Sequence, residues 1–209
     1  MKLTSALSIL AAAAFATGCA APKDHYYTLA ANGSGATPAA SPAGPLFIEM
    51  APVGVPERLA RPQMLVRKDS AGAEVRLLDQ HRWASSFENE LRDALAAGVA
   101  GRTGAVDVTR GNRPATQPVW RIAVQVRQFD AVEDSRVDTA MGWTLRRIDR
   151  DAALSCSWSA SERVEAGIDA LAAGAQRITQ RAANALGDQL LALQNQPQAG
   201  CIAAAPASR

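Results

Sequence analysis

Long hydrophobic runs are scarce in this 209-residue sequence, and so are the residues that build most metal sites. The apolar run at residues 7–15 is the length of a signal-peptide core, and no second run approaches the length of a bilayer crossing. The two histidines, His25 and His81, lie in separate segments without a ligand-spaced cluster of Cys, Asp or Glu around them. The sequence therefore predicts neither a membrane-spanning helix nor a metal site.

An excess of charge of either sign is also missing. The chain has 22 Lys and Arg against 20 Asp and Glu, and Lys2 belongs to the predicted leader. Binding to nucleic acid, or to an anionic lipid surface through bulk charge, would need a clear basic excess. We therefore expect no nucleic-acid partner.

Motifs that carry catalysis are missing too. There is no Gly-x-Ser-x-Gly elbow, no P-loop and no dinucleotide fingerprint, and Gly33-Ser34-Gly35 lies in a low-complexity stretch. Glu88 and Glu90 fall on different faces of a predicted helix, and Asp134 and Asp138 are expected in a turn-rich connection. The sequence predicts a protein that is not an enzyme and that carries no cofactor, with a hydrolase the least favoured reading.

The N-terminus is typical of a bacterial lipoprotein. A short basic start and the apolar run lead to Ala16-Thr17-Gly18-Cys19, which reads as a lipobox. Residues 1–18 are then a signal peptide, and Cys19 is the lipidated first residue of the mature chain. The alternative is an ordinary secretory signal with an incidental cysteine. Ala20 follows the cysteine in place of the Asp that retains lipoproteins at the inner membrane, which favours the periplasmic face of the outer membrane.

Two further cysteines, Cys156 and Cys201, remain in an oxidising compartment. An even count permits a disulfide between them. Cys156 shares a predicted strand face with Leu154 and Trp158, which suits a buried free thiol equally well. Both readings stay open at this point.

The stretch at residues 31–45 contains only small and polar residue types with proline and cannot order itself by burial. It is either the lipoprotein tether or a loop inside the domain. We favour the loop, because Tyr26-Tyr27-Thr28-Leu29 before it has the composition of a strand and would have no packing partner in a linker. The tether is then residues 19–25, and residues 196–209 form a flexible C-terminal tail.

Between these segments the periodicity predicts one domain, residues 26–195. Period-two alternation predicts long strands over 119–127, 139–148 and 152–164, with a bulge near Gln128 where Phe129 breaks the parity. Two helical stripes are predicted to pack in the core, and membrane binding is the less favoured alternative for the second. The first comprises Trp83, Phe87, Leu91, Leu95 and Val99, and the second lies within Ile168 to Leu193. The expected fold class is α/β (α+β), with a largely antiparallel sheet packed on one face by two long helices.

The segment from residue 52 to 99 carries a family resemblance. Pro52-Val53-Gly54-Val55-Pro56-Glu57-Arg58-Leu59, then Arg61-Pro62-Gln63-Met64-Leu65-Val66-Arg67 and Arg82-Trp83-Ala84, resemble the ABC-type transport auxiliary lipoproteins, the paraquat-inducible C-type subunits linked to membrane integrity. Tyr26-Tyr27-Thr28-Leu29 resembles that family's first strand.

The resemblance implies an outer-membrane lipoprotein subunit of an envelope lipid transport system. The implied partners are a periplasmic mammalian-cell-entry (MCE) protein that forms a tube, and an inner-membrane transporter component. The resemblance also implies a homo-oligomeric ring that receives the end of that tube. The alternative function is a structural or assembly lipoprotein without a transport conduit.

Overall fold

The computed structural model describes residues 23–30, 44–69, 71–111 and 113–202. The signal peptide, Cys19 and most of the low-complexity stretch lie outside them. The described residues form one α+β domain, a mixed sheet with two helices. The elements are β1 (His25–Tyr27), β2 (Phe47–Met50), the 3-10 helix η1 (Glu57–Leu59), β3 (Gln63–Arg67), β4 (Val75–Trp83), α2 (Phe87–Thr103), β5 (Val106–Asp107), β6 (Val119–Val132), β7 (Arg136–Arg147), β8 (Ala153–Arg163) and α3 (Ile168–Asn195).

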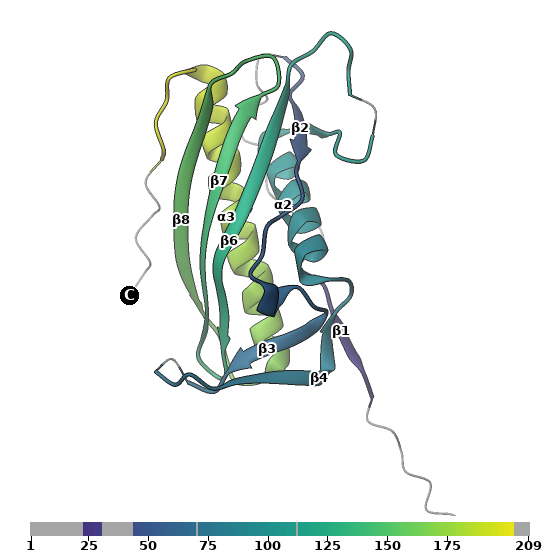
Figure 1. Ribbon diagram of the computed structural model, residues 1–209, viewed down its shortest axis with the longest axis vertical. Coiled ribbons are helices and arrows are strands. Elements are labelled where there is room, and N and C mark those ends of the chain that lie inside the picture. The colour runs from purple at the N-terminus through teal and green to yellow at the C-terminus, as the bar shows by residue number, and fades with distance from the viewer. Residues whose placement is uncertain (1–22, 31–43, 70, 112, 203–209) are drawn as a thin grey trace, which may run out of the picture.

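An antiparallel meander of β6, β7 and β8 forms one half of the sheet (Figure 1). The register of β6 against β7 shifts between Val126 and Gln128, so the predicted bulge is confirmed. On β8 the serines at 155, 157 and 159 are exposed and Cys156 and Trp158 are buried, which confirms a polar outer face. Two-residue alternation is carried by neighbouring residues of one strand, and here it was sufficient to predict the strands of the meander.

The other half of the sheet is less antiparallel than expected. Strand β2 pairs in parallel with both β5 and β6, and β3 pairs in parallel with the far end of β6. The hairpin of β3 and β4 is antiparallel. Parallel neighbouring strands require crossover connections. The connections here contain η1 and α2, so the strands that pair lie far apart in the chain.

Helices α2 and α3 lie together on one face of the sheet (Figure 1). The stripe of α3 is buried from Leu171 to Leu193, as its three- and four-residue spacing predicts. The first stripe needs a correction. Trp83 is the last residue of β4, and α2 begins at Phe87. The two rings still lie 5.9 Å apart, because the chain turns between them and Trp83 enters the same core.

The N-terminal segment joins the sheet. Strand β1 pairs in parallel with the end of β4, with Tyr27 opposite Trp83, and Leu29 beyond it is buried. Residues 26–29 are thus part of the domain rather than of a linker, as we favoured from the sequence, and His25, which we assigned to the tether, is the first residue of β1. Neither α2 nor α3, within the described part of the chain, combines the length and hydropathy that a bilayer crossing requires.

Candidate functional site

The predicted lipidation site, Cys19, lies outside the described residues, which begin at Lys23. The attachment of the first described segment to the domain is therefore the nearest feature to the predicted anchor. We call β1 and the side chains that hold residues 25–30 the anchoring end. It is built by β1, the end of β4 and the first turns of α2 and α3. This end lies at one extreme of the long axis of the molecule (Figure 1).

Tyr27 is the first fixed point of the anchoring end. Its hydroxyl donates to Asp169 Oδ1 in the first turn of α3 at 2.6 Å and lies 2.9 Å from His81 Nδ1. Burial and the hydrogen bond to Asp169 raise the pKa of Tyr27 to about 12, and the nearby negative charge of Asp169 adds to the rise. The phenol is therefore neutral and can act as a donor throughout the ordinary pH range.

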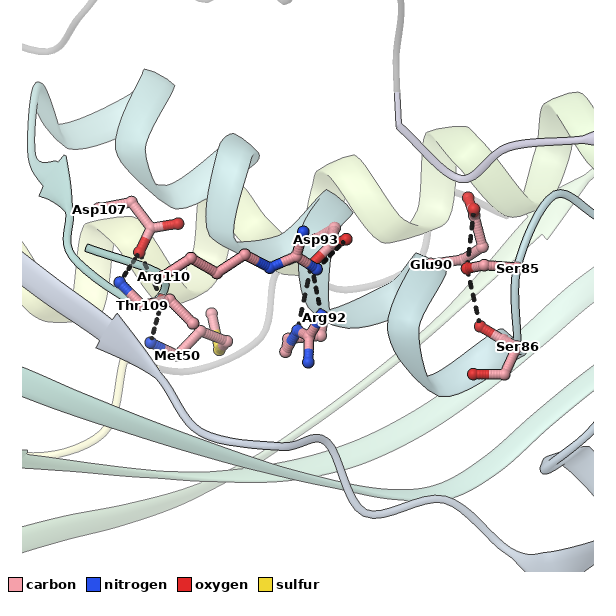
Figure 2. Close-up of polar contacts among 9 residues, drawn as sticks. All are labelled: Met50, Ser85, Ser86, Glu90, Arg92, Asp93, Asp107, Thr109 and Arg110. Carbon is pink, nitrogen blue, oxygen red and sulfur yellow. Dashed lines mark hydrogen bonds and ion pairs between the residues drawn. The ribbon is translucent and has the colours of Figure 1, made fainter.

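Glu90 of α2 is the second fixed point. Its carboxylate accepts from the Thr28 hydroxyl at 2.8 Å and from the Leu29 backbone N–H at 3.0 Å. Ser85, just before the helix, donates to the other carboxylate oxygen at 3.1 Å (Figure 2). Hydrogen bonds to an ionised acceptor are among the stronger ones. Glu90 therefore joins the start of the domain to the start of α2, a role that its sequence context did not reveal.

Gln176 of α3 completes this arrangement. Its side-chain amide donates to the backbone carbonyls of Thr28 at 2.7 Å and of Ala30 at 3.3 Å. Residues 25–30 are consequently held by β4, α2 and α3 together. The contacts at the anchoring end are those of a structural attachment of the N-terminal segment to the domain.

The two histidines meet at the anchoring end, contrary to their expected separation. His25 lies directly opposite His81 in the register of β1 and β4, and the rings stack with centroids 5.0 Å apart. Sequence spacing could not show this, because parallel pairing of residues 56 positions apart leaves no local pattern. Within the described part of the chain, no group of three Cys, His, Asp or Glu residues is placed to hold a metal ion.

The segment that carries the family resemblance builds the crossover from β2 to β3. Gly54 forms a bridge to β6, donating to Val124 O at 2.9 Å and accepting from Val126 N at 2.8 Å. A Cβ at Gly54 would fall 2.0 Å from Gln125 Oε1, so any other residue there would require the end of the Gln125 side chain to move. Arg58 and Arg67 both lie near Asp130 of β6, at 3.6 and 3.5 Å. The motif is therefore architectural.

A second polar cluster lies about one turn further along α2, at Asp93. Asp93 accepts from its neighbour Arg92 and, through both carboxylate oxygens, from Arg110 in the loop after β5 (Figure 2). In the same loop the Thr109 hydroxyl accepts from the Met50 backbone N–H at 2.8 Å. These contacts attach the loop to both α2 and β2. Of the charged residues that line the surface hollow here, Arg92 and Arg110 pair with Asp93, and Asp107 accepts hydrogen bonds from Thr109.

Cys156 of β8 and Cys201 are joined by a disulfide in the structure, with their Cα atoms 5.6 Å apart. Residues 196–202, which we call the C-terminal strap, lie against the end of α3. Gln189, only 1% exposed, donates to Gly200 O at 2.9 Å and accepts from Ile202 N at 2.6 Å. The first half of the predicted tail is thus fixed to the domain.

Comparison with known proteins agrees with this architecture. One solved structure, an uncharacterized protein, superposes with a TM-score of 0.63 at 16% identity, over 81% of this chain and 99% of that one. A protein from Xanthomonas campestris, described under the family DUF330, has a TM-score of 0.61 at 17% identity, over 85% and 100% of the two chains. These likenesses show the fold alone. Comparison with curated proteins finds no matching sequence.

A family model matches residues 27–187, from the second tyrosine of β1 to the last third of α3. The match covers the crossover motif, the three-stranded meander and both helices. The family is one of transport auxiliary components and is not a class of enzymes. The chain belongs to the ABC-type transport auxiliary lipoprotein component family.

Proposed function

We propose that the protein is an outer-membrane lipoprotein that docks the periplasmic MCE tube of an envelope lipid transport system. Family membership supports the role in transport. The lipobox supports removal of residues 1–18 and acylation of Cys19, and Ala20 supports the outer membrane. The observation that best supports the docking role is the attachment of β1 to the rest of the domain, because β1 begins only six residues after Cys19.

The short connection restricts where the domain works. Six residues reach about 20 Å even when fully extended, so the anchoring end stays next to the membrane. From there α3 extends for 28 residues, or roughly 40 Å, towards the strap. A subunit that receives the mouth of a conduit needs this constant placement, whereas an enzyme that ranges through the periplasm does not.

The proposed assembly is a homo-oligomeric ring. Several subunits in one ring engage one tube at high effective concentration, so a weak contact per subunit gives a strong attachment overall. The acyl chains hold the ring at the outer membrane. Behind the tube, an inner-membrane transporter component completes the system.

The test is a pull-down of the chain from Ala20 to Arg209 with the periplasmic part of the MCE protein encoded beside it. Light scattering on the same preparation measures its oligomeric state. We expect specific capture and an assembly larger than a dimer. No capture, together with a strictly monomeric protein at high concentration, would favour the structural lipoprotein without a conduit.

A further inference from the structure

A cavity of about 260 Å³ lies at the end of the domain opposite the anchoring end. It opens between the C-terminal turns of α3, the adjacent ends of β6, β7 and β8, and the strap. Its apolar lining comes chiefly from Trp120, Leu145, Leu154 and Leu193, and residues 197–199 form one wall. The volume is near the lower end of the range for small-molecule sites, about 300–1,000 Å³.

The charge of this cavity is of one sign. Arg147 and Arg150 line it, and no carboxylate residue is among its lining residues. Arg147 donates two hydrogen bonds to Asp149, which faces solvent. Arg150 forms no ion pair with any residue in the part of the chain that the structure describes. An apolar pocket with arginines at its lining suits an anionic group attached to an apolar chain.

The strap makes the cavity a built feature of the fold. The buried Gln189 amide satisfies two strap backbone groups, and the disulfide to Cys156 holds the strap beside β8. Trp120 Nε1 donates to Gln194 Oε1 at 3.2 Å, which orients the indole ring in the lining. The wall formed by residues 197–199 therefore depends on contacts at both of its ends.

We propose that this cavity binds a monoacyl anion, a single acyl chain that carries a carboxylate or phosphate head. The chain contacts Trp120, Leu145, Leu154 and Leu193, and Arg150 pairs with the head. The site is too small for a two-chain lipid. It lies roughly 36 Å along α3 from Asp169, farther than the about 20 Å that the six residues after Cys19 can span, and we take the ligand to be a separate molecule. This inference does not depend on MCE docking.

The test is calorimetric titration of the chain from Ala20 to Arg209 with ten-carbon amphiphiles below their aggregation concentrations. Decanoate and decyl phosphate are compared with decyltrimethylammonium, and octanoate reports on chain length. We expect one saturable site for the anions, at least about tenfold weaker binding of the cation, and an increase of up to about fourfold in affinity per added CH₂. Equal affinity for anion and cation would overturn the proposal.

Matched variants locate the site. Arg150→Glu should weaken decanoate binding at least about tenfold. Arg146→Glu makes the same charge change at a β7 residue that does not line the cavity, and it should have little effect on decanoate binding. Ala152→Trp should abolish binding by filling the cavity, while circular dichroism checks that each variant folds. Equal effects of the two arginine variants, or unchanged binding by Ala152→Trp, would overturn the assignment.

Three further measurements test the role of the strap and the class of ligand. Cys201→Ser should weaken decanoate binding by releasing the strap, and mass spectrometry of alkylated, unreduced wild-type protein should find no labelled thiol. A peptide ending in a leucine carboxylate serves as the competing ligand class. If that peptide displaces decanoate and binds more tightly, the natural ligand is the C-terminus of a protein, and the assignment of a monoacyl anion is wrong. Each measurement uses the isolated chain, so its failure leaves the docking proposal untouched.

Discussion

At the residue scale, Tyr27 and Glu90 make the N-terminal segment part of the domain. Each links β1 or the residues just after it to a helix, Tyr27 through Asp169 of α3 and Glu90 through Thr28. Neither stands out in the sequence. Their partners lie 142 and 62 positions away, so only the fold brings them together.

The raised pKa of Tyr27 gives a pH prediction. In the unfolded chain the phenol ionises near pH 10, whereas in the folded protein it keeps its proton until about pH 12. Its contribution to stability is therefore fully present below pH 10 and is lost as the pH rises towards 12. Between pH 9 and 11.5 the wild type should lose about 1 kcal/mol more of unfolding free energy than Tyr27→Phe, after allowance for solvent screening.

Urea denaturation at several pH values measures this difference. Tyr26→Phe is the matched control, because Tyr26 is 62% exposed and should leave the pH dependence as in the wild type. Parallel pH profiles for Tyr27→Phe and the wild type would contradict the role assigned to the phenol.

Residue patterns predicted the meander well and the anchoring end poorly. Alternation from Trp120 to Val126, broken at Phe129, is visible because adjacent residues of one strand carry it. The pairing of His25 with His81 depends on where β4 ends, and that end was misjudged. Trp83 is four residues before Phe87, so this strand residue stands at a helical spacing from the first residue of α2 and was assigned to the helix. The contacts between Gln189 and the strap were also not predicted, because side chains that hydrogen-bond to a backbone segment show no periodic pattern in the sequence.

At the scale of elements, the two helices come close together at small residues. A Cβ at Gly98 of α2 would lie 2.5 Å from the Cβ of Ala183 on α3, closer than real Cβ atoms come. The backbones of the helices therefore set this distance, with no flexible side chain to give way. The crossing of α2 and α3 in turn sets where Glu90 and Gln176 meet the residues after β1.

Gly98→Ala should destabilise the protein by roughly 1–3 kcal/mol, the range for overpacking a core. Helix propensity alone would favour alanine by about 1 kcal/mol, so a net loss reports the contact between the helices. Equilibrium denaturation measures the change. Adding Ala183→Gly should recover part of the loss, because it removes the opposing Cβ. A neutral or stabilising Gly98→Ala would mean that the helices separate freely.

At the scale of the whole molecule, the proposed lipidation of Cys19 would decide where the domain is held. Acyl chains on this residue would keep the protein at a membrane, since two or more chains give stable attachment. If the proposed location is right, the wild type should be found in the outer-membrane fraction and a Cys19→Ala variant should leave it. Density-gradient fractionation with markers for both membranes provides the measurement. Retention of the variant with outer membranes would exclude the lipid as the anchor, and a wild type in the inner-membrane fraction would exclude the proposed location.

The parallel pairing of β1 with β4 also determines how the domain carries a mechanical load. Tension from a membrane-held N-terminus enters β1 at His25, and a pull along the strand strains its bonds to β4 together, in shear, instead of opening them one after another. The Ala84 N–H, which donates to Tyr27 O at 2.7 Å, and the Glu90 carboxylate take part of the same force. The load therefore passes directly to both helices, and in the proposed ring a tube that moves against the subunits would pull on the core of each one.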